Sequence, residues 1–299
     1  MTTVLLTGAT GFVGRRLEPV LIERGLKVRA MTRSPEDYDG EAEPVAGDVF
    51  DADTLGPALE GVDVAVYLVH SLGDRDFERR DAEAAKAFGR AAAQAGVRQI
   101  VYLGGLGGDG ELSPHLRSRR EVESLLGEAG VPVTVLRAAV IVGAGGISWE
   151  ITRQLVENLP AMIVPKWAKT RTQPIAITDV VRYLDGVIDN PEAIGRVFEI
   201  GGTDQLTYLD MIQQAAEVMR GNRRAIATVP VLTPSLSSHW ISFVTDVDTT
   251  TAANLIESMS TEVIVTDQSI RDLVPGEPLT YQEAVRRALE EDETNQRWA

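Results

Sequence analysis

The sequence predicts an α/β protein with a Rossmann-type, doubly wound parallel sheet and a smaller C-terminal lobe. Three observations favour this fold: apolar runs alternate with helical patterns through the first half of the chain, the run VDVAVYLV is continuously apolar, and a glycine-rich turn directly follows the first apolar run. Such alternation is typical of parallel sheets that carry helices on both faces, because their strands are then buried on both sides.

The expected elements follow one another in regular order. Strands are expected at TTVLLTGA, KVRAMTR, EPVAGDV, VDVAVYLV, RQIVYLGG, VPVTVLRA and GRVFEIGG. Helices are expected at about 11–23, at ADTLGPALEG, at about 76–95 before Gly96, and within SPHLRSRREVESLL, where Ser113 is a suitable N-cap and Pro114 a suitable first residue. A further helix at TDVVRYLDGVI is expected to be capped by Thr178 or Asp179.

Composition narrows the possible functions. The chain has 299 residues, a formal net charge of −15, no cysteine and three histidines. The negative charge disfavours nucleic acid and anionic membranes as partners, and no apolar run approaches the roughly 20 residues of a membrane span. Without cysteine, disulfides and thiolate chemistry are excluded, and the three scattered histidines do not predict a metal site. Because the N-terminus lacks the pattern of a signal peptide, we expect a cytoplasmic protein.

The stretch TGATGFVG predicts a dinucleotide-binding loop. Its glycines have the spacing G-x-x-G-x-x-G between a strand and a helix, which allows a tight turn, close approach of a pyrophosphate and close packing of helix on strand. The residues expected to contact the cofactor are Gly8, Thr10, Gly11, Phe12, Val13 and Gly14. A tight turn without a ligand is the alternative.

Arg33 indicates which cofactor binds. It stands at the end of the second strand, where NAD-binding proteins carry an acidic residue for the ribose hydroxyl. An arginine there can pair with a 2′-phosphate, so NADP(H) is favoured and NAD(H) remains possible. A surface arginine without a ligand is the alternative reading.

From the order of the expected elements, we expect 1–145, completed by about 174–202, to form the cofactor-binding domain, and 146–173 with 203–299 to form the smaller lobe.

The chain resembles the extended or atypical branch of the short-chain dehydrogenase/reductase superfamily. The strings YLVHS, YLGGL, S-x-H-L-x-S-R-x-x-V-E and Q-P-I-x-I-x-D-V are similar to the NmrA-like NAD(P)-binding group, which includes an accessory subunit of respiratory complex I. The resemblance implies adenine contacts from Asp48 and Val49 and ribose-side contacts from Leu68, Val69 and His70. It also implies a nicotinamide border of Ala138, Ala139 and Val140.

The sequence departs from that family where the chemistry lies. Ordinary members have Tyr-x-x-x-Lys, whereas these positions hold His115 and Arg119, and the strand before them ends in Gly104 and Gly105 instead of a Ser or Thr. At i,i+4 spacing the pair shares one helix face. Arg119 stays protonated and pushes the imidazole toward its neutral form, which can still polarise a carbonyl. Alternatively, His115 is exposed to solvent and Arg119 anchors the cofactor or pairs with Glu123.

These observations favour an NADP(H)-dependent reductase of a small quinone, enone or carbonyl compound. A non-catalytic redox sensor or complex-assembly protein is the alternative, and a sugar-nucleotide epimerase is disfavoured by the missing Tyr. A homodimer or a protein partner is compatible with either. The segment 104–110 is either a mobile flap or a plain flexible loop. Trp167 and Gln173 lie in the region of the family's substrate pocket, where Trp167 is favoured as a packing residue over a substrate platform. A core or interface role is expected for His239 and Trp240.

Overall fold

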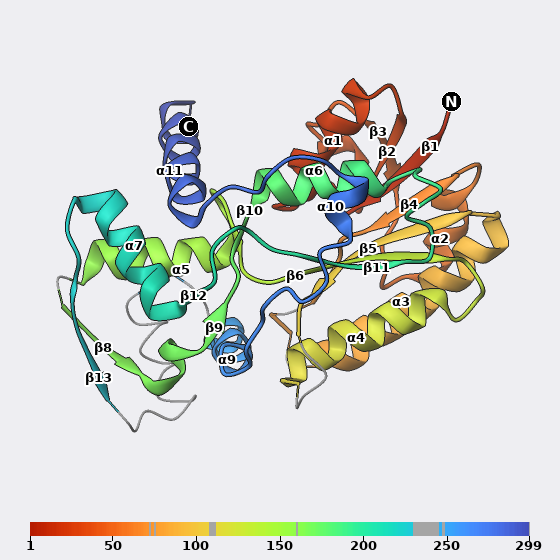
Figure 1. Ribbon diagram of the computed structural model, residues 1–299. Helices are drawn as coiled ribbons and strands as arrows, with labels where there is room; N and C mark the ends of the chain where they lie inside the picture. Colours follow the sequence, from red (N-terminus) through yellow and green to blue (C-terminus); the bar gives the residue numbers. More distant parts are fainter. Residues whose placement is uncertain are drawn as a thin grey trace.

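A seven-stranded parallel sheet forms the centre of the molecule in the computed structural model, which describes residues 1–71, 73–74, 76–107, 112–159, 161–229, 245–246 and 249–298. The strand order is β11-β6-β5-β4-β1-β2-β3 (Figure 1). The strands are β1 (Thr3–Thr7), β2 (Lys27–Thr32), β3 (Glu43–Ala46), β4 (Val64–Tyr67), β5 (Gln99–Gly105), β6 (Val133–Ala138) and β11 (Val197–Ile200). The predicted Rossmann-type α/β fold is confirmed.

The order of the strands reverses beside β1. From β1 the chain runs outward through β2 and β3, and then returns to place β4 on the other side of β1. In open parallel sheets, ligands bind at the carboxyl ends of the strands that flank such a switch point. The topology therefore directs a ligand to the loops that follow β1 and β4.

Helices cover both faces of the sheet, as the continuous apolar strands require. On one face, α1 (Gly14–Glu23) and α6 (Ile177–Val187) pack on the even-numbered residues of β1. On the other face lie α2 (Ala52–Leu59), α3 (Phe77–Ala95) and α4 (Pro114–Gly127). The caps expected for this layer are present: the Ser113 hydroxyl accepts a bond from Leu116 N at 3.3 Å, and Gly96 ends α3 with φ of 77°.

A second group of helices lies beside the sheet layer (Figure 1) and packs around a hydrophobic core of its own. Its helices are α5 (Ile147–Asn158), α7 (Tyr208–Arg220), α9 (Thr249–Ser258) and α11 (Tyr281–Trp298). The other elements are β7 (Ile141–Val142), β8 (Ala161–Pro165), β9 (Arg171–Thr172), β10 (Ile175–Ala176), β12 (Leu206–Thr207), β13 (Ala225–Val229), α10 (Ile270–Leu273), η1 (Pro35–Asp37) and η2 (Lys166–Lys169). The proposed domain boundaries stay a prediction.

Three expected local features are wrong. The first helix begins at Gly14 rather than Gly11, because Gly11 N closes a turn on Gly8 O at 2.9 Å. The third strand ends at Ala46, before the GDV stretch. Neither expected residue caps α6: its N-cap is Ala176, while Asp179 accepts bonds from Leu279 N at 2.9 Å and the Arg182 guanidinium at 3.0 Å.

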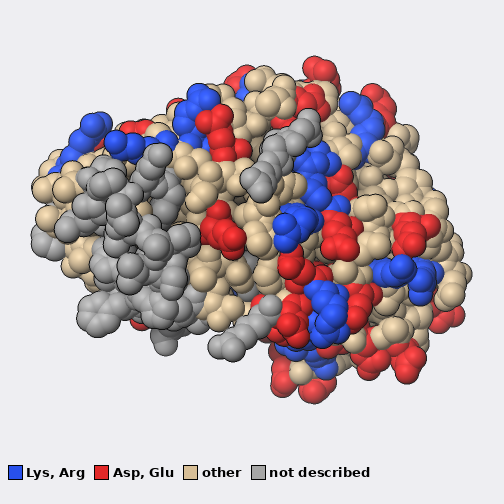
Figure 2. All heavy atoms as spheres, turned by 90° about the horizontal axis from the view of Figure 1, so that it is seen from below, with Lys and Arg blue, Asp and Glu red and all other residues tan. Residues whose placement is uncertain are grey.

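Over the described ranges, no helix combines the length and the apolar character that crossing a bilayer requires. Figure 2 shows one face of the molecule, on which basic and acidic side chains are intermingled over the part that is not grey. The expected cytoplasmic location and the expected lack of nucleic-acid partners stay predictions.

Candidate cofactor and substrate pocket

The loop after β1 has the geometry of an anion cradle. Gly8 has φ of 65°, in the left-handed region, which residues with a Cβ atom rarely adopt. A Cβ on Gly14 would lie 2.2 Å from Gly8 O and 2.7 Å from Ala9 Cα, so the start of α1 packs directly on the loop backbone. Because the first N–H groups of a helix lack intrahelical partners, this arrangement fits the pyrophosphate of a dinucleotide.

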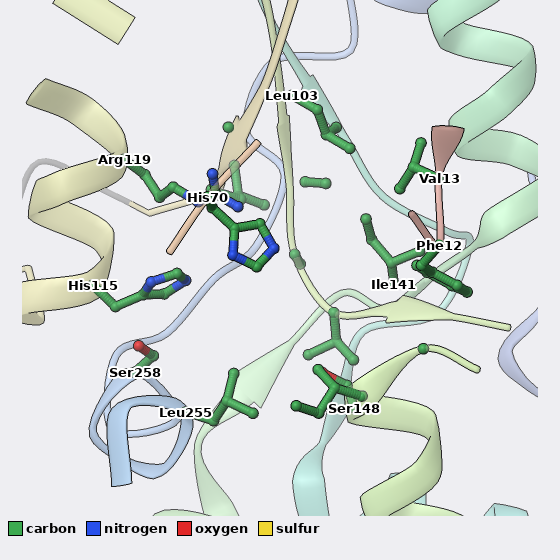
Figure 3. Close-up of a pocket in the computed structure, with 18 of the residues that line it drawn as sticks. Phe12, Val13, His70, Leu103, His115, Arg119, Ile141, Ser148, Leu255 and Ser258 are labelled. Carbon is green, nitrogen blue, oxygen red and sulfur yellow. The ribbon is translucent and has the colours of Figure 1, made fainter. Parts of the chain in front are cut away.

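The pocket opens at the carboxyl ends of the central strands and has a cavity volume of about 460 Å³. Its walls are mostly apolar, and its polar side chains include two imidazoles and one guanidinium (Figure 3). The lining from the sheet side consists of Gly8, Thr10, Gly11, Phe12, Val13, Gly14, Leu68, Val69, His70, Leu103, Gly104, Gly105, Leu106, His115, Leu116, Arg119, Ala138, Ala139, Val140 and Ile141.

The structure brings most of the predicted site residues together at this pocket. Three of them lie outside it. Arg33 is exposed directly after β2, and none of the described residues forms an ion pair with it. Asp48 accepts a bond from Phe50 N at 3.0 Å, and Val49 is buried. All three follow β2 or β3 at the carboxyl edge of the sheet, and their roles at the adenosine end of the cofactor stay predictions.

His70 and His115 lie close together on the side of the pocket that also carries Arg119, opposite Phe12 and Ile141 (Figure 3). Burial, and then the charge of Arg119, lowers the pKa of His115 to about 3. The alternative of a solvent-exposed His115 is therefore wrong, since its ring lies half-buried in the cavity wall and 6.3 Å from the ring of Phe77. His70 keeps an exposed side, and the protein atoms crowded around it, with the Arg119 charge, lower its pKa. Both rings are neutral at neutral pH.

Arg119 does not pair with Glu123, as one alternative reading proposed. The Glu123 carboxylate is held in a two-pronged ion pair with Arg137 of β6, at 2.6 Å and 3.1 Å. Arg119 donates a long hydrogen bond from Nη1 to Tyr102 Oη at 3.4 Å. Most N–H groups of the Arg119 guanidinium are thus available to a ligand in the cavity.

The far wall of the pocket comes from the second core, and sequence reasoning missed it. These residues are Gly146, Ile147, Ser148, Tyr208, Leu255, Ser258, Met259 and Val263. Ser258 at the end of α9 lies 3.0 Å, Oγ to Oγ, from Ser113 at the N-cap of α4, so the two walls are joined beside His115. No motif marks these positions, and an apolar helical pattern around Leu255 was the only signal available.

The secondary candidates fare differently. Gln173 is buried and bonded to Gly202 O at 2.7 Å and to Val265 N at 3.1 Å, and it does not line this pocket, so its place near the substrate stays a prediction. Gly104 and Gly105 line the pocket, whereas 108–110 of the expected flap lies outside the described residues. The side chain of Trp167, as well as His239 and Trp240, also lies outside them. No cluster of three potential metal ligands occurs in the described part of the chain.

Comparison with known proteins places this architecture in a family. The sequence model of a family described as NAD(P)H-binding matches residues 8–163, which include the glycine loop, both imidazoles and Arg119. The chain belongs to this NAD(P)H-binding family. The expected NAD(P)H-binding family and the expected similarity to a complex I subunit are confirmed.

Proteins with sequences similar to this chain include both a reductase and a subunit of a larger complex. A ceramide reductase of Caulobacter vibrioides is 28% identical over 75% of this chain and 72% of its own length. A mitochondrial NADH dehydrogenase (ubiquinone) 1 alpha subcomplex subunit 9 of Arabidopsis thaliana is 25% identical over 71% of this chain and 57% of its own length. The NADPH complex of an Escherichia coli quinone oxidoreductase superposes with a TM-score of 0.78 over 96% of this chain and 99% of its own. At 19% identity, that likeness shows the fold alone.

Proposed function

We propose that this protein is an NADP(H)-dependent reductase of a small, apolar, conjugated carbonyl compound such as a quinone or an enone. The observation that carries the proposal is the continuity of one cavity from the glycine loop to an apolar chamber with His70, His115 and Arg119 on its wall. A bound nicotinamide supplies a hydride, and the protein supplies orientation and electrostatics. The loop of Gly8 to Gly14 would hold the pyrophosphate, and Ala138 to Val140 would border the nicotinamide.

The preference for NADP(H) is proposed from Arg33. This exposed guanidinium, unpaired among the described residues, follows the last residue of β2, within the region where the 2′-substituent of the adenosine ribose is read. A charge-assisted hydrogen bond to a phosphate contributes about 1.5–3 kcal/mol. We therefore expect Arg33→Ala to raise the Kd of NADPH about ten- to a hundredfold and to leave that of NADH unchanged. The exposed Arg90 of α3 provides the control variant Arg90→Ala, and equal losses for both cofactors would contradict the assignment.

The reductase itself is tested by cofactor oxidation. The purified protein is titrated with NADPH by fluorescence, and absorbance of the bound cofactor is then followed with quinones, enones and aldehydes. Acceptor-dependent decay that saturates with acceptor concentration is the expected result. Tight NADPH binding with no decay for any acceptor would refute the proposal.

A second function has one specific observation in its favour. The chain is similar to a complex I subunit, and the Tyr and Lys of ordinary members of the superfamily are replaced by His115 and Arg119. A non-catalytic cofactor-binding role in sensing or assembly would leave NADPH unconsumed and would give stable co-purification with a specific protein. The same fluorescence and absorbance experiment, repeated on material isolated from native cells, separates the two functions.

A further inference from the structure

The electrostatic balance of the pocket is unusual for an apolar chamber. Among the described residues that line it, Arg119 carries the only permanent charge, and no Asp or Glu belongs to the wall. The two imidazoles beside Arg119 are His70 and His115, which shares its helix, and the pKa of both is lowered to about 3. The chamber therefore carries one positive charge on mostly apolar, partly buried walls, an arrangement that favours an anionic group beside the guanidinium.

The nearest carboxylates are committed elsewhere. Asp81 of α3 is buried and accepts bonds from Ser71 N at 2.9 Å and Ser71 Oγ at 2.6 Å, which holds the loop that carries His70. Glu123 is occupied by Arg137. Within the described residues, no carboxylate contacts the Arg119 guanidinium. Asp81 lies in electrostatic reach of Arg119 and offsets part of its charge without contacting it, so a ligand oxygen could supply the anion in direct contact with the guanidinium.

Besides Asp81, the ionisable groups in electrostatic reach of Arg119 include two phenols and two imidazoles, which are hydrogen-bond donors. Tyr67 of β4 and Tyr102 of β5 lie in its electrostatic reach, and burial raises the pKa of both phenols. Each neutral imidazole has one N–H to donate. His115 lies in the first turn of α4, where the positive end of the helix dipole favours the neutral form of the ring. A neutral imidazole can polarise an oxygen without transferring a full proton. The cluster is suited to stabilising charge rather than to acid catalysis.

We propose that Arg119, together with N–H groups of His70 and His115, forms an oxyanion site that takes over the work of the missing Tyr acid. The inference rests on the proposed reductase function. In an enone acceptor, a C–H bond forms at the conjugated carbon with the hydrogen and two electrons of the dihydronicotinamide, which is oxidised to the nicotinamide cation. The C=C electron pair shifts, the C=O π bond breaks, and the carbonyl oxygen becomes an enolate oxyanion. The enolate then takes its proton from water.

This arrangement defines the substrate class. Preorganised donors aimed at developing charge are worth most where water is excluded. Conjugated acceptors give delocalised enolates or phenolates, which a fixed guanidinium can hold until solvent supplies the proton. Saturated aldehydes and ketones would give strongly basic alkoxides, and they need an acid that this pocket does not offer. Quinones and enones are therefore expected to be reduced and simple aldehydes are not.

The oxyanion site can be measured without turnover. Para-nitrophenol changes colour on ionisation, and it is added to the protein with and without NADP⁺, an oxidised cofactor that cannot reduce it. In the wild type, the bound phenol is expected to ionise at a pH at least about one unit lower than in water, a tenfold shift in its equilibrium. Arg119→Lys should keep most of this shift because it keeps the charge, and Arg119→Gln should abolish it. Arg117→Gln is the matched control, since Arg117 pairs with Glu78 on the exposed side of α4.

The outcomes separate this inference from the function on which it rests. An unshifted ionisation in the wild type, no binding of the probe, or a shift that survives in a folded Arg119→Gln protein would each overturn the oxyanion site. NADPH turnover with quinones alongside any of these results would leave the reductase intact. A shifted probe with no turnover for any acceptor would refute the reductase while the anion site stands. Circular dichroism of each variant establishes that it is folded.

Discussion

Replacing Gly14 by alanine is expected to weaken both the fold and cofactor binding. The added Cβ would lie 2.2 Å from Gly8 O, 2.7 Å from Ala9 Cα and 2.9 Å from Ala9 O. Non-bonded heavy atoms stay about 3.5 Å apart at their optimum. All three contacts are backbone atoms that no rotamer change can remove, so helix and loop must separate by roughly 1 Å to approach that distance.

The size of the effect follows from this separation. Overpacking of this kind costs about 1–3 kcal/mol. With an unfolding entropy of about 2.1 cal/mol/K per residue and 299 residues, each kcal/mol lowers Tm by about 2 °C, so we expect a loss of about 2–5 °C. A cradle that opens by this amount should also lose at least one charge-assisted hydrogen bond to the pyrophosphate, which raises the Kd of NADPH about tenfold or more.

Thermal unfolding and a fluorescence titration with NADPH measure the two effects. Gly127→Ala is the control, because its Cβ would meet only a methyl group of Val133, at 3.2 Å, and it lies far from the loop at the end of α4. That variant should change Tm by less than about 2 °C and leave the Kd unchanged. Wild-type Tm and Kd in Gly14→Ala would refute both the packing argument and the assignment of the loop.

Two further predictions concern buried ionisable groups. Because the pKa of His115 falls to about 3 in the folded protein from about 6.5 when unfolded, the folded state binds fewer protons between these values and stability falls as pH drops through this window. Urea unfolding at neutral and acidic pH should therefore show a smaller acid loss in His115→Gln, and identical losses would contradict the shift. Glu18 is buried in α1 and accepts bonds from Glu41 N at 2.7 Å and Ala42 N at 3.0 Å. Glu18→Gln should cost about 1.5–3 kcal/mol in urea unfolding, whereas the exposed Glu23→Gln on the same helix should cost little, and equal midpoints would rule out this anchoring role.

Features that depend on a few neighbouring residues were predictable. The alternation of apolar runs and helices, the glycine spacing, the Ser113 cap and the Gly96 stop were all confirmed. Each arises from hydrogen bonds, backbone angles or periodicity within one turn or one strand. The predicted cap on α6 failed because the helix begins earlier, after Ala176, which pairs with Val142 in a short sheet; the Asp179 carboxylate accepts instead from Leu279 N, 100 residues away.

The amino-acid sequence by itself determined the doubly wound sheet, the anion-binding loop and the altered pair at His115 and Arg119. Only the tertiary structure decided what surrounds that pair. Arg137 of β6 removes Glu123 from Arg119, and α9 closes the chamber with Leu255 and Ser258. The physical reason is that propensity and periodicity act locally, whereas ion pairing and desolvation depend on atoms that folding brings together from distant parts of the chain.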